Sequence, residues 1–472
     1  MLSLLRLVAP AALTFAALPL LALAQQPDAR RDASAPPAYQ KLRYDEDYAY
    51  LEDPSRRSDF WDPFKFIPLN DAGDAYFSLG GEGRWRYERY HDYQWDPEAR
   101  DDGGYLLQRY LLSGDLHLSA WFRAFAQLQS SLEEWRAGGP RPTDRDRLDL
   151  HQLFGDVRLP LDRDDDTLTL RVGRQEMLYG SQRLVSVRES PNIRRSFDAV
   201  RLLTRYQDWR VDAFAARPVQ DEPGVFDDWK NPHAGFWGLY ATHPLRAGLN
   251  LDLYYLGIWN RDAEFAQGSG HEERHSLGAR LFGEWNGWDC NFEGVLQFGS
   301  FAGSEILAWT FASDTGYTFA AAPLAPRIGL KSAAISGDGN PDHGKLGTFN
   351  PLFPRGAYFS EAALVWPANL LDVDPTLELQ LTEHVGLTAD WDVFWRYSSD
   401  DALYTGGGNV ARPPDGDARF IGHQPSVTLS WQVDRHASFN VAYTHFFAGG
   451  FIRESGPDTD VDFVGAWLLY RF

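Results

Sequence analysis

Arginines are concentrated in one stretch of a chain that is strongly acidic overall. The formal net charge is -21, yet residues 173–202 hold six arginines and only three carboxylates. The arginines are Arg174, Arg183, Arg188, Arg194, Arg195 and Arg201, and the carboxylates are Glu176, Glu189 and Asp198. A guanidinium stays charged and pairs through two parallel hydrogen bonds with a carboxylate or phosphate. This basic stretch therefore predicts a site for an anionic ligand.

Further arginines lie outside this stretch. Arg355 occurs in GTFNPLFPRGAYF (residues 347–359), whose prolines and glycines predict a rigid loop that lies over or in a pore, or an ordinary extracellular loop. Four more fall on the polar faces of predicted strands. The candidate ligand-binding or pore-lining residues are Arg84, Arg86, Arg109, Arg123, Arg174, Arg188, Arg194, Arg195 and Arg355.

Two interpretations of these arginines are open. A single arginine in a polar wall is expected to pair with a neighbouring Asp or Glu and to brace the wall. The cluster as a whole is expected to attract anions. Arg174 is a special case, because strict alternation from Leu170 and Val172 points it away from the polar face. We assume a β-bulge at Gly173 that turns it inward.

The elements that must position these residues are β-strands with alternating faces. In the last segment, Val464, Ala466, Leu468, Tyr470 and Phe472 share one face, while Arg471 lies on the other. The same pattern recurs back to about residue 75. It predicts strands near 79–88, 106–119, 122–133, 148–159, 167–177, 197–206, 208–217, 235–243, 249–260, 274–285, 288–299, 305–319, 327–338, 375–383, 386–398, 424–434, 437–449 and 461–472.

The predicted connections alternate between short and long. Those near 206–208, 286–287 and 434–436 are short, whereas 218–234, 260–273, 339–374 and 399–423 are long and rich in Gly, Pro and Asp. Short turns at one end and long loops at the other are typical of an antiparallel transmembrane β-barrel, here of about 18 strands. A soluble all-β jelly roll or propeller is the alternative. No blade-length repeat supports it, and the apolar face is too extensive for one core.

The N-terminus predicts export. Arg6 precedes an apolar run from Val8 to Leu21, and Ala22-Leu23-Ala24 fits the cleavage rule, so residues 1–24 are expected to be a signal peptide. The rest of the chain has no run of 18 apolar residues, so no transmembrane helix is expected. Residues 25–74 are expected to form a periplasmic or lumenal lead-in, and residues 75–472 an all-β barrel. With one cysteine, Cys290, the fold has no internal disulfide.

No constellation predicts catalysis or a cofactor. The histidines are scattered, and His117 beside Ser119 is a weak hint of a hydrolase or lyase site. The acidic run 162–166 lacks the Gly-centred spacing of a calcium loop, so no metal site is expected. The acidic charge disfavours nucleic acid as a partner.

Four segments resemble the alginate export porin family of Gram-negative outer membranes. They are the basic stretch 173–202, the segment 347–359, the lead-in LRYDEDYAYL…DPFKFIPL and the strand SLGGEGRWRYERY. The resemblance implies a monomeric 18-stranded barrel, with an arginine-rich constriction through which a uronate polysaccharide leaves the periplasm. The basic residues in the matching stretches are Arg84, Arg109, Arg174, Arg188, Arg194 and Arg355.

Three functions remain open at this point. The first is a passive outer-membrane channel that exports an anionic, alginate-like polyuronate. The second is a general or small-solute porin for saccharides or carboxylates. The third is a barrel enzyme that cleaves polysaccharide. For the first, the expected partners are the polysaccharide, outer-membrane lipid and a periplasmic biosynthesis or export complex.

Overall fold

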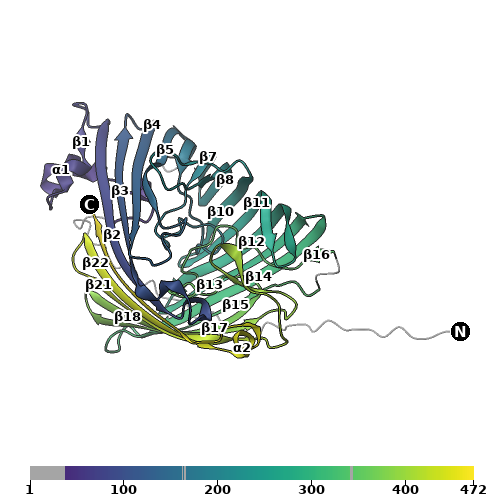
Figure 1. Ribbon diagram of the computed structural model, residues 1–472. Helices are drawn as coiled ribbons and strands as arrows, with labels where there is room; N and C mark the ends of the chain where they lie inside the picture. The colour runs from purple at the N-terminus through teal and green to yellow at the C-terminus, as the bar shows by residue number, and fades with distance from the viewer. Residues whose placement is uncertain (1–37, 162, 164–165, 341–343) are drawn as a thin grey trace, which may run out of the picture. The chain divides into compact units, whose positions relative to one another are not determined.

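The computed structural model describes residues 38–161, 163, 166–340 and 344–472. The expected signal peptide and residues 25–37 of the lead-in lie outside the described residues. Most of the described chain is antiparallel β-strand (Figure 1). No helix among these residues is long and apolar enough to cross a membrane.

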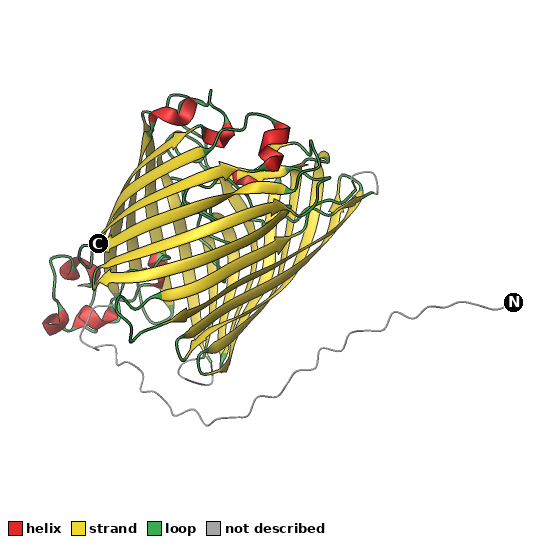
Figure 2. Cartoon of the chain, turned by 90° about the horizontal axis from the view of Figure 1, so that it is seen from below, coloured by secondary structure: helices red, strands yellow, loops and turns green. Residues whose placement is uncertain are grey.

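Eighteen long strands form a closed antiparallel barrel, which confirms the predicted fold class (Figure 2). Each strand pairs with the next long strand, and the first pairs with the last through Arg84 and Leu469. The strands are β2 (Tyr76–His91), β3 (Tyr105–His117), β4 (Phe122–Glu134), β5 (Asp146–Pro160), β6 (Thr167–Gln175), β7 (Phe197–Tyr206), β8 (Trp209–Gln220), β10 (Ala234–Arg246), β11 (Leu249–Phe265), β12 (Gly268–Trp285), β13 (Trp288–Phe301), β14 (Ser304–Thr318), β15 (Arg327–Ile335), β17 (Leu370–Thr382), β18 (Val385–Arg396), β21 (Phe420–Gln432), β22 (Ala437–Ala448) and β23 (Val461–Arg471).

Short elements occur in the lead-in and the loops. The short strands are β1 (Ile67–Pro68), β9 (Trp229–Lys230), β16 (Lys345–Leu346), β19 (Leu403–Thr405) and β20 (Asn409–Arg412). The α-helices are α1 (Asp62–Lys65) and α2 (Gly450–Ser455). The 3-10 turns are Arg43–Asp45, Ala49–Glu52, Pro54–Arg56, Tyr93–Trp95, Arg100–Gly103 and Gly406–Gly408.

The barrel wall is apolar outside and polar inside. On β2, Trp85 and Tyr87 are exposed, whereas Glu82, Arg84 and Arg86 are buried. Exposed Leu, Val, Phe and Trp side chains continue around the outer face of the other strands. Because a soluble protein places its apolar face inward, this arrangement fits a barrel surrounded by lipid. The outer membrane is the location of such barrels.

The longest connections of the barrel lie at one end, which also has the short turns 266–267 and 302–303. The connections 118–121, 207–208, 247–248, 286–287, 383–384 and 433–436 share one end, which we assign to the periplasm. The other end carries the long segments 92–104, 176–196, 221–233, 336–369, 397–419 and 449–460. It is therefore the extracellular end.

The prediction of a long loop at residues 260–273 is wrong. β11 and β12 continue through this region and are joined by residues 266–267 alone. The outward apolar residues stop near Trp259, and polar residues follow on both strands. Because this part of the hairpin extends beyond the apolar belt, its outer face need not be apolar, and the polar sequence looked like a loop.

The described lead-in packs at the periplasmic end of the barrel. Arg43 donates hydrogen bonds to the carbonyl oxygens of Gly81 (3.0 Å) and Phe472 (2.8 Å). The Trp61 ring stacks on the Phe472 ring, with centroids 4.0 Å apart, and its Nε1 donates to Tyr470 Oη at 2.9 Å. These contacts attach the lead-in to the last strand.

Candidate functional site

Two segments with unusual sequence fold into the barrel and meet there. The first lumen loop (residues 176–196) follows β6, and the second lumen loop (the described residues 336–340 and 344–369) follows β15. Val185 and Phe353 form a β-bridge between the two loops. Ser186 N donates to Phe353 O at 2.9 Å, and Phe353 N donates to Leu184 O at 2.8 Å. The two loops therefore contact each other inside the barrel, which Figure 1 shows as a ribbon.

Arg84 and Arg109 hold the first lumen loop against the wall formed by β2 and β3. Both guanidinium groups donate to Glu189 O, at 2.6 and 3.1 Å. Arg109 also pairs with the carboxylates of Glu189 and Glu82. Asn192 supports the same contact by donating to three backbone carbonyls at 3.0 Å each. Both arginines brace the loop in this structure.

Glu189 is the acceptor shared by three arginines. Besides Arg109, its carboxylate lies 2.7 Å from Arg194 Nη1 and 3.8 Å from Arg84 Nη1. Burial favours the neutral acid, but the three guanidinium groups hold the pKa of Glu189 well below its usual range. Arg194 additionally pairs with Glu176 at 2.5 Å and donates to Lys41 O at 2.9 Å, which ties the loop to the lead-in.

Three other predicted arginines are also paired. Arg86 contacts Glu88 at 2.5 Å and Glu361 of the second lumen loop at 2.7 Å. Arg123 pairs with Asp115 at 2.6 Å, and Arg188 pairs with Asp221 at 2.6 Å. Such pairs neutralise the guanidinium charge locally, so these residues resemble wall braces more than free anion sites.

Arg174 lies on the outward face, and the bulge assumed at Gly173 is wrong. β6 pairs in continuous register with β5 and β7, and the partner of Arg174 on β5 is the exposed Leu153. Arg174 pairs with Asp198 at 2.9 Å at the extracellular end of β6. Its terminal nitrogens reach the carbonyl oxygens of Leu150 (3.3 Å) and Asp228 (3.4 Å).

Arg195 and Arg355 differ from the other candidates, because neither has a carboxylate partner among the described residues. Arg195 approaches Pro354 O at 3.5 Å and lies over the Phe353 ring. Burial and the nearby charge of Arg188 lower the pKa of Arg195 to about 9. Arg355 is exposed and donates to Tyr358 O at 2.7 Å. These two guanidinium groups retain hydrogen-bonding capacity for an anion.

A cavity of about 880 Å³ opens at the periplasmic end, between the lead-in and β3–β12. Its lining includes the exposed arginines Arg158, Arg205 and Arg210, which have no ion pair among the described residues. These three arginines are not among the predicted site residues, which centre on the basic stretch 173–202. They fall on the inward faces of predicted strands, so alternation with Asp156 and Asp212 could have found them.

The lumen wall formed by β15, β17 and β18 carries the opposite charge. Asp372, Asp374, Asp390 and Asp392 lie on the inward faces, and Lys331 pairs with Asp374 at 3.0 Å. The lumen thus has arginines on the two loops and on one side of the wall, and an acidic patch on another.

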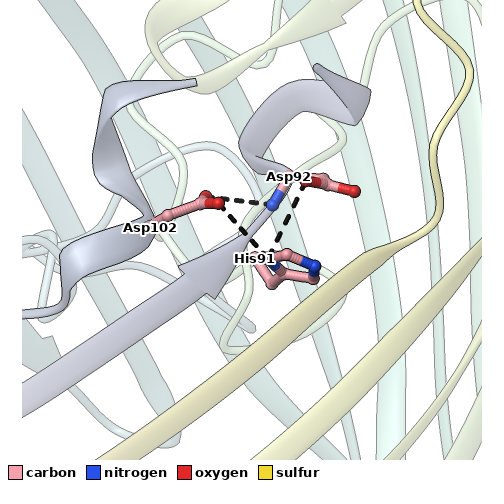
Figure 3. Close-up of side chains that lie close together, drawn as sticks. All are labelled: His91, Asp92 and Asp102. Atoms are coloured by element: carbon pink, nitrogen blue, oxygen red, sulfur yellow. Dashed lines mark hydrogen bonds and ion pairs between the residues drawn. The ribbon is translucent and has the colours of Figure 1, made fainter. Parts of the chain in front are cut away.

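Residues that could ligate a metal also occur outside the lumen. His91 Nδ1 lies 3.2 Å from Asp102 Oδ2 and 3.8 Å from Asp92 Oδ1, at the extracellular end of β2 (Figure 3). The Asp92 amide donates to Asp102 Oδ1 at 3.0 Å. His91, Asp92 and Asp102 therefore bind one another, which accounts for their closeness without an ion.

Comparison with known proteins agrees with the barrel architecture. A family model described as "Alginate export" matches residues 75–465. OpdK from Pseudomonas aeruginosa, solved with vanillate, is 11% identical, with a TM-score of 0.56 over 86% of this chain and 99% of that chain. A BenF-like porin from Pseudomonas fluorescens Pf-5 is 8% identical, with a TM-score of 0.57 over 84% and 98%. No curated protein matches the chain.

Proposed function

Because the chain belongs to the alginate export family, we propose that it is an outer-membrane channel for an anionic polysaccharide. The polymer would be an alginate-like polyuronate that passes from the periplasm to the exterior. The family description supports the solute class, and the barrel with its polar interior supports a transport role rather than an enzymatic one. In this proposal the barrel acts as a monomer in lipid, and a periplasmic biosynthesis or export complex delivers the polymer.

The observation that carries this proposal is the set of arginines that have no carboxylate partner among the described residues. Arg158, Arg205 and Arg210 lie at the periplasmic cavity, and Arg195 and Arg355 lie on the lumen loops. Each contact with a uronate carboxylate is worth about 1–4 kcal/mol before desolvation. Several weak sites allow a polymer to slide, whereas one tight site would retain it. The arginines that form ion pairs stabilise the lumen wall and the first lumen loop.

A small-solute porin is the second candidate. The two lumen loops bridge the barrel through Val185 and Phe353, which narrows the path. OpdK, with the same architecture, was solved with the small carboxylate vanillate. In this alternative the unpaired arginines would bind single carboxylates rather than a chain.

Single-channel recording in planar bilayers separates the candidates. For the exporter we expect anion selectivity and current block by added polyuronate. Replacing Arg158, Arg205 and Arg210 with Ala, or Arg195 and Arg355 with Ala, should lower both. Arg89→Ala is the matched control, because Arg89 is an exposed arginine on the outward face of β2.

Three results would contradict the exporter. Small carboxylates that permeate without any block by polyuronate would favour the porin. Unchanged selectivity in both arginine variants would show that these groups do not guide anions. Shortening of the polymer by the purified protein would indicate an enzyme.

A further inference from the structure

The acidic patch on β17 and β18 is short of positive charge. Asp372 and Asp374 lie on β17, Asp390 and Asp392 lie on β18, and all four face inward. Lys331 of β15 is the cation that pairs with this patch among the described residues. Four carboxylates and one ammonium give a formal charge of -4 + 1 = -3. The patch therefore has three formal negative charges that no cation among the described residues offsets.

Three of these carboxylates are buried, Asp390 is half-buried, and two of the four have an oxygen without a hydrogen-bond partner among the described residues. Asp374 and Asp392 are each 1% exposed, and Asp372 is 5% exposed. Oδ1 of Asp372 and Oδ1 of Asp390 have no hydrogen-bond partner in the part of the chain that the structure describes. Asp372 lies two residues before Asp374 on β17, and both side chains are on the inward face.

Gln424 of β21 places its side-chain amide beside the same patch. Its Nε2 donates to Asp392 Oδ2 at 2.8 Å, so the amide group lies against the carboxylates. The amide oxygen, Oε1, has no hydrogen-bond partner among the described residues, and Gln424 is 1% exposed. A buried amide oxygen without a donor is destabilising unless something positive approaches it.

The spacing of the oxygens suits a divalent cation. One carboxylate oxygen from each of Asp374, Asp390 and Asp392 lies within 4.8 Å of the others. Oxygens bound to one Ca²⁺ lie at about 2.3–2.6 Å from it, so they are separated by no more than about 5 Å. Ca²⁺ takes six to eight oxygen ligands, including carboxylates and amide oxygens.

We propose that Asp374, Asp390 and Asp392 bind one divalent cation of the Ca²⁺ type in the lumen wall, assisted by Asp372 and Gln424. The bound ion changes the formal charge of the patch from -3 to -1. It supplies the positive partner that the two unpaired carboxylate oxygens and the Gln424 amide oxygen lack.

The site has a consequence for transport that rests on the proposed function. An acidic patch on the lumen wall repels a polyanion, and a bound divalent cation removes most of that repulsion. Addition of Ca²⁺ should therefore raise anion selectivity in the wild-type channel. The binding measurement below does not depend on any transported solute, so the two ideas can fail separately.

The test is calorimetric titration of CaCl₂ into the chelator-treated, detergent-solubilised full chain. We expect one site per chain in the wild type. In the D374N/D392N variant the affinity should fall at least about 100-fold, because two of three carboxylate ligands are lost. Asp149→Asn is the matched control. It alters a separate acidic group, Asp146, Asp149 and Asp228, and should leave the lumen site intact.

Thermal unfolding gives a second readout that a purely structural role would not produce. Ca²⁺ should raise the Tm of the wild type and of Asp149→Asn but not of D374N/D392N. Each variant is compared with and without Ca²⁺, because D374N also removes the ion-pair partner of Lys331 and changes the stability of the apo form. The proposal is overturned if the wild type binds no Ca²⁺, or if folded D374N/D392N binds it with unchanged affinity.

Discussion

Glu189 illustrates how one carboxylate can organise a basic site. It lies on the first lumen loop and forms ion pairs with Arg84, Arg109 and Arg194, which come from two strands and from the loop itself. Without it, three buried or nearly buried guanidinium groups would face one another. The carboxylate therefore both attaches the loop and suppresses the positive charge of this part of the lumen.

Glu189→Gln should make the pore more selective for anions and the protein less stable. The amide keeps the shape of the side chain but removes the charge that offsets three arginines. Allowing for the partial exposure of Glu189, we expect a loss of about 1–3 kcal/mol in the free energy of unfolding. Reversal potentials measure the anion selectivity, and unfolding in guanidinium chloride measures the stability. Unchanged selectivity would mean that solvent already screens these arginines.

At the residue scale, sequence alone predicted which side chains face inward but not what they contact. Alternation placed Arg84 and Arg109 on the polar face, where the structure has them. Their partner Glu189 is 80 or more residues away in a loop, and no strand periodicity encodes how such a loop folds back. Arg174 was misplaced because a bulge was assumed where the register is continuous.

At the element scale, the contact between the two lumen loops determines how far the channel is closed. Gly356 lies where the loops meet, and a Cβ built there would be 1.5 Å from Ser190 O. A backbone atom cannot give way as the end of a flexible side chain can. Even alanine at this position must therefore separate the loops.

Gly356→Ala should increase single-channel conductance and its fluctuations, because the two loops can no longer pack closely. Gly339→Ala is the matched control from the same loop, since a Cβ there meets nothing within 4 Å. Planar-bilayer recordings of both variants provide the comparison. Equal conductance of Gly356→Ala and wild type would show that the loop contact does not restrict the path.

At the scale of the whole molecule, the lead-in and the barrel are coupled through Lys65. Its ammonium is buried at the periplasmic end, 4.9 Å from the centroid of the Tyr48 ring and 5.7 Å from that of Phe472. Lys65 Nζ has no hydrogen-bond partner among the described residues. Burial lowers the pKa of Lys65 to about 7.

The attachment of the lead-in should strengthen as the pH rises above 7. Released Lys65 holds its proton up to about pH 10.4, whereas docked Lys65 loses it near 7, so docking releases a proton between these values. Docking is weakest, and insensitive to pH, below about 7. Limited proteolysis of the lead-in should be at least about tenfold slower at pH 9.5 than at pH 6.5.

Lys65→Met is the control for this pH dependence. The variant has the same apolar stem and no charge, so its lead-in should be protected equally at both pH values. A difference that persists in Lys65→Met would come from the protease or from another group. Equal cleavage of the wild type at both pH values would mean that docked Lys65 keeps its proton.

The fold as a whole was more predictable than its interior. Each of the eighteen predicted strands overlaps a long strand of the barrel, since lipid outside and polar groups inside impose a period of two on the sequence. That constraint ends where the lipid ends. The β11–β12 extension was therefore missed, and so was the bridge between Val185 and Phe353, which depends on contacts between distant segments.

The length of the β11–β12 hairpin also determines which part of the molecule is exposed on the outer surface of the cell. β11 has 17 residues and β12 has 18, whereas a strand crosses the bilayer with about 9–11. The surplus extends beyond the lipid and ends at Ala266 and Gln267, which donate hydrogen bonds to Tyr404 Oη and Asp401 Oδ1. A foreign epitope inserted at this tip should be bound by antibody on intact bacteria, which would make the hairpin a handle for surface display and for reporting orientation.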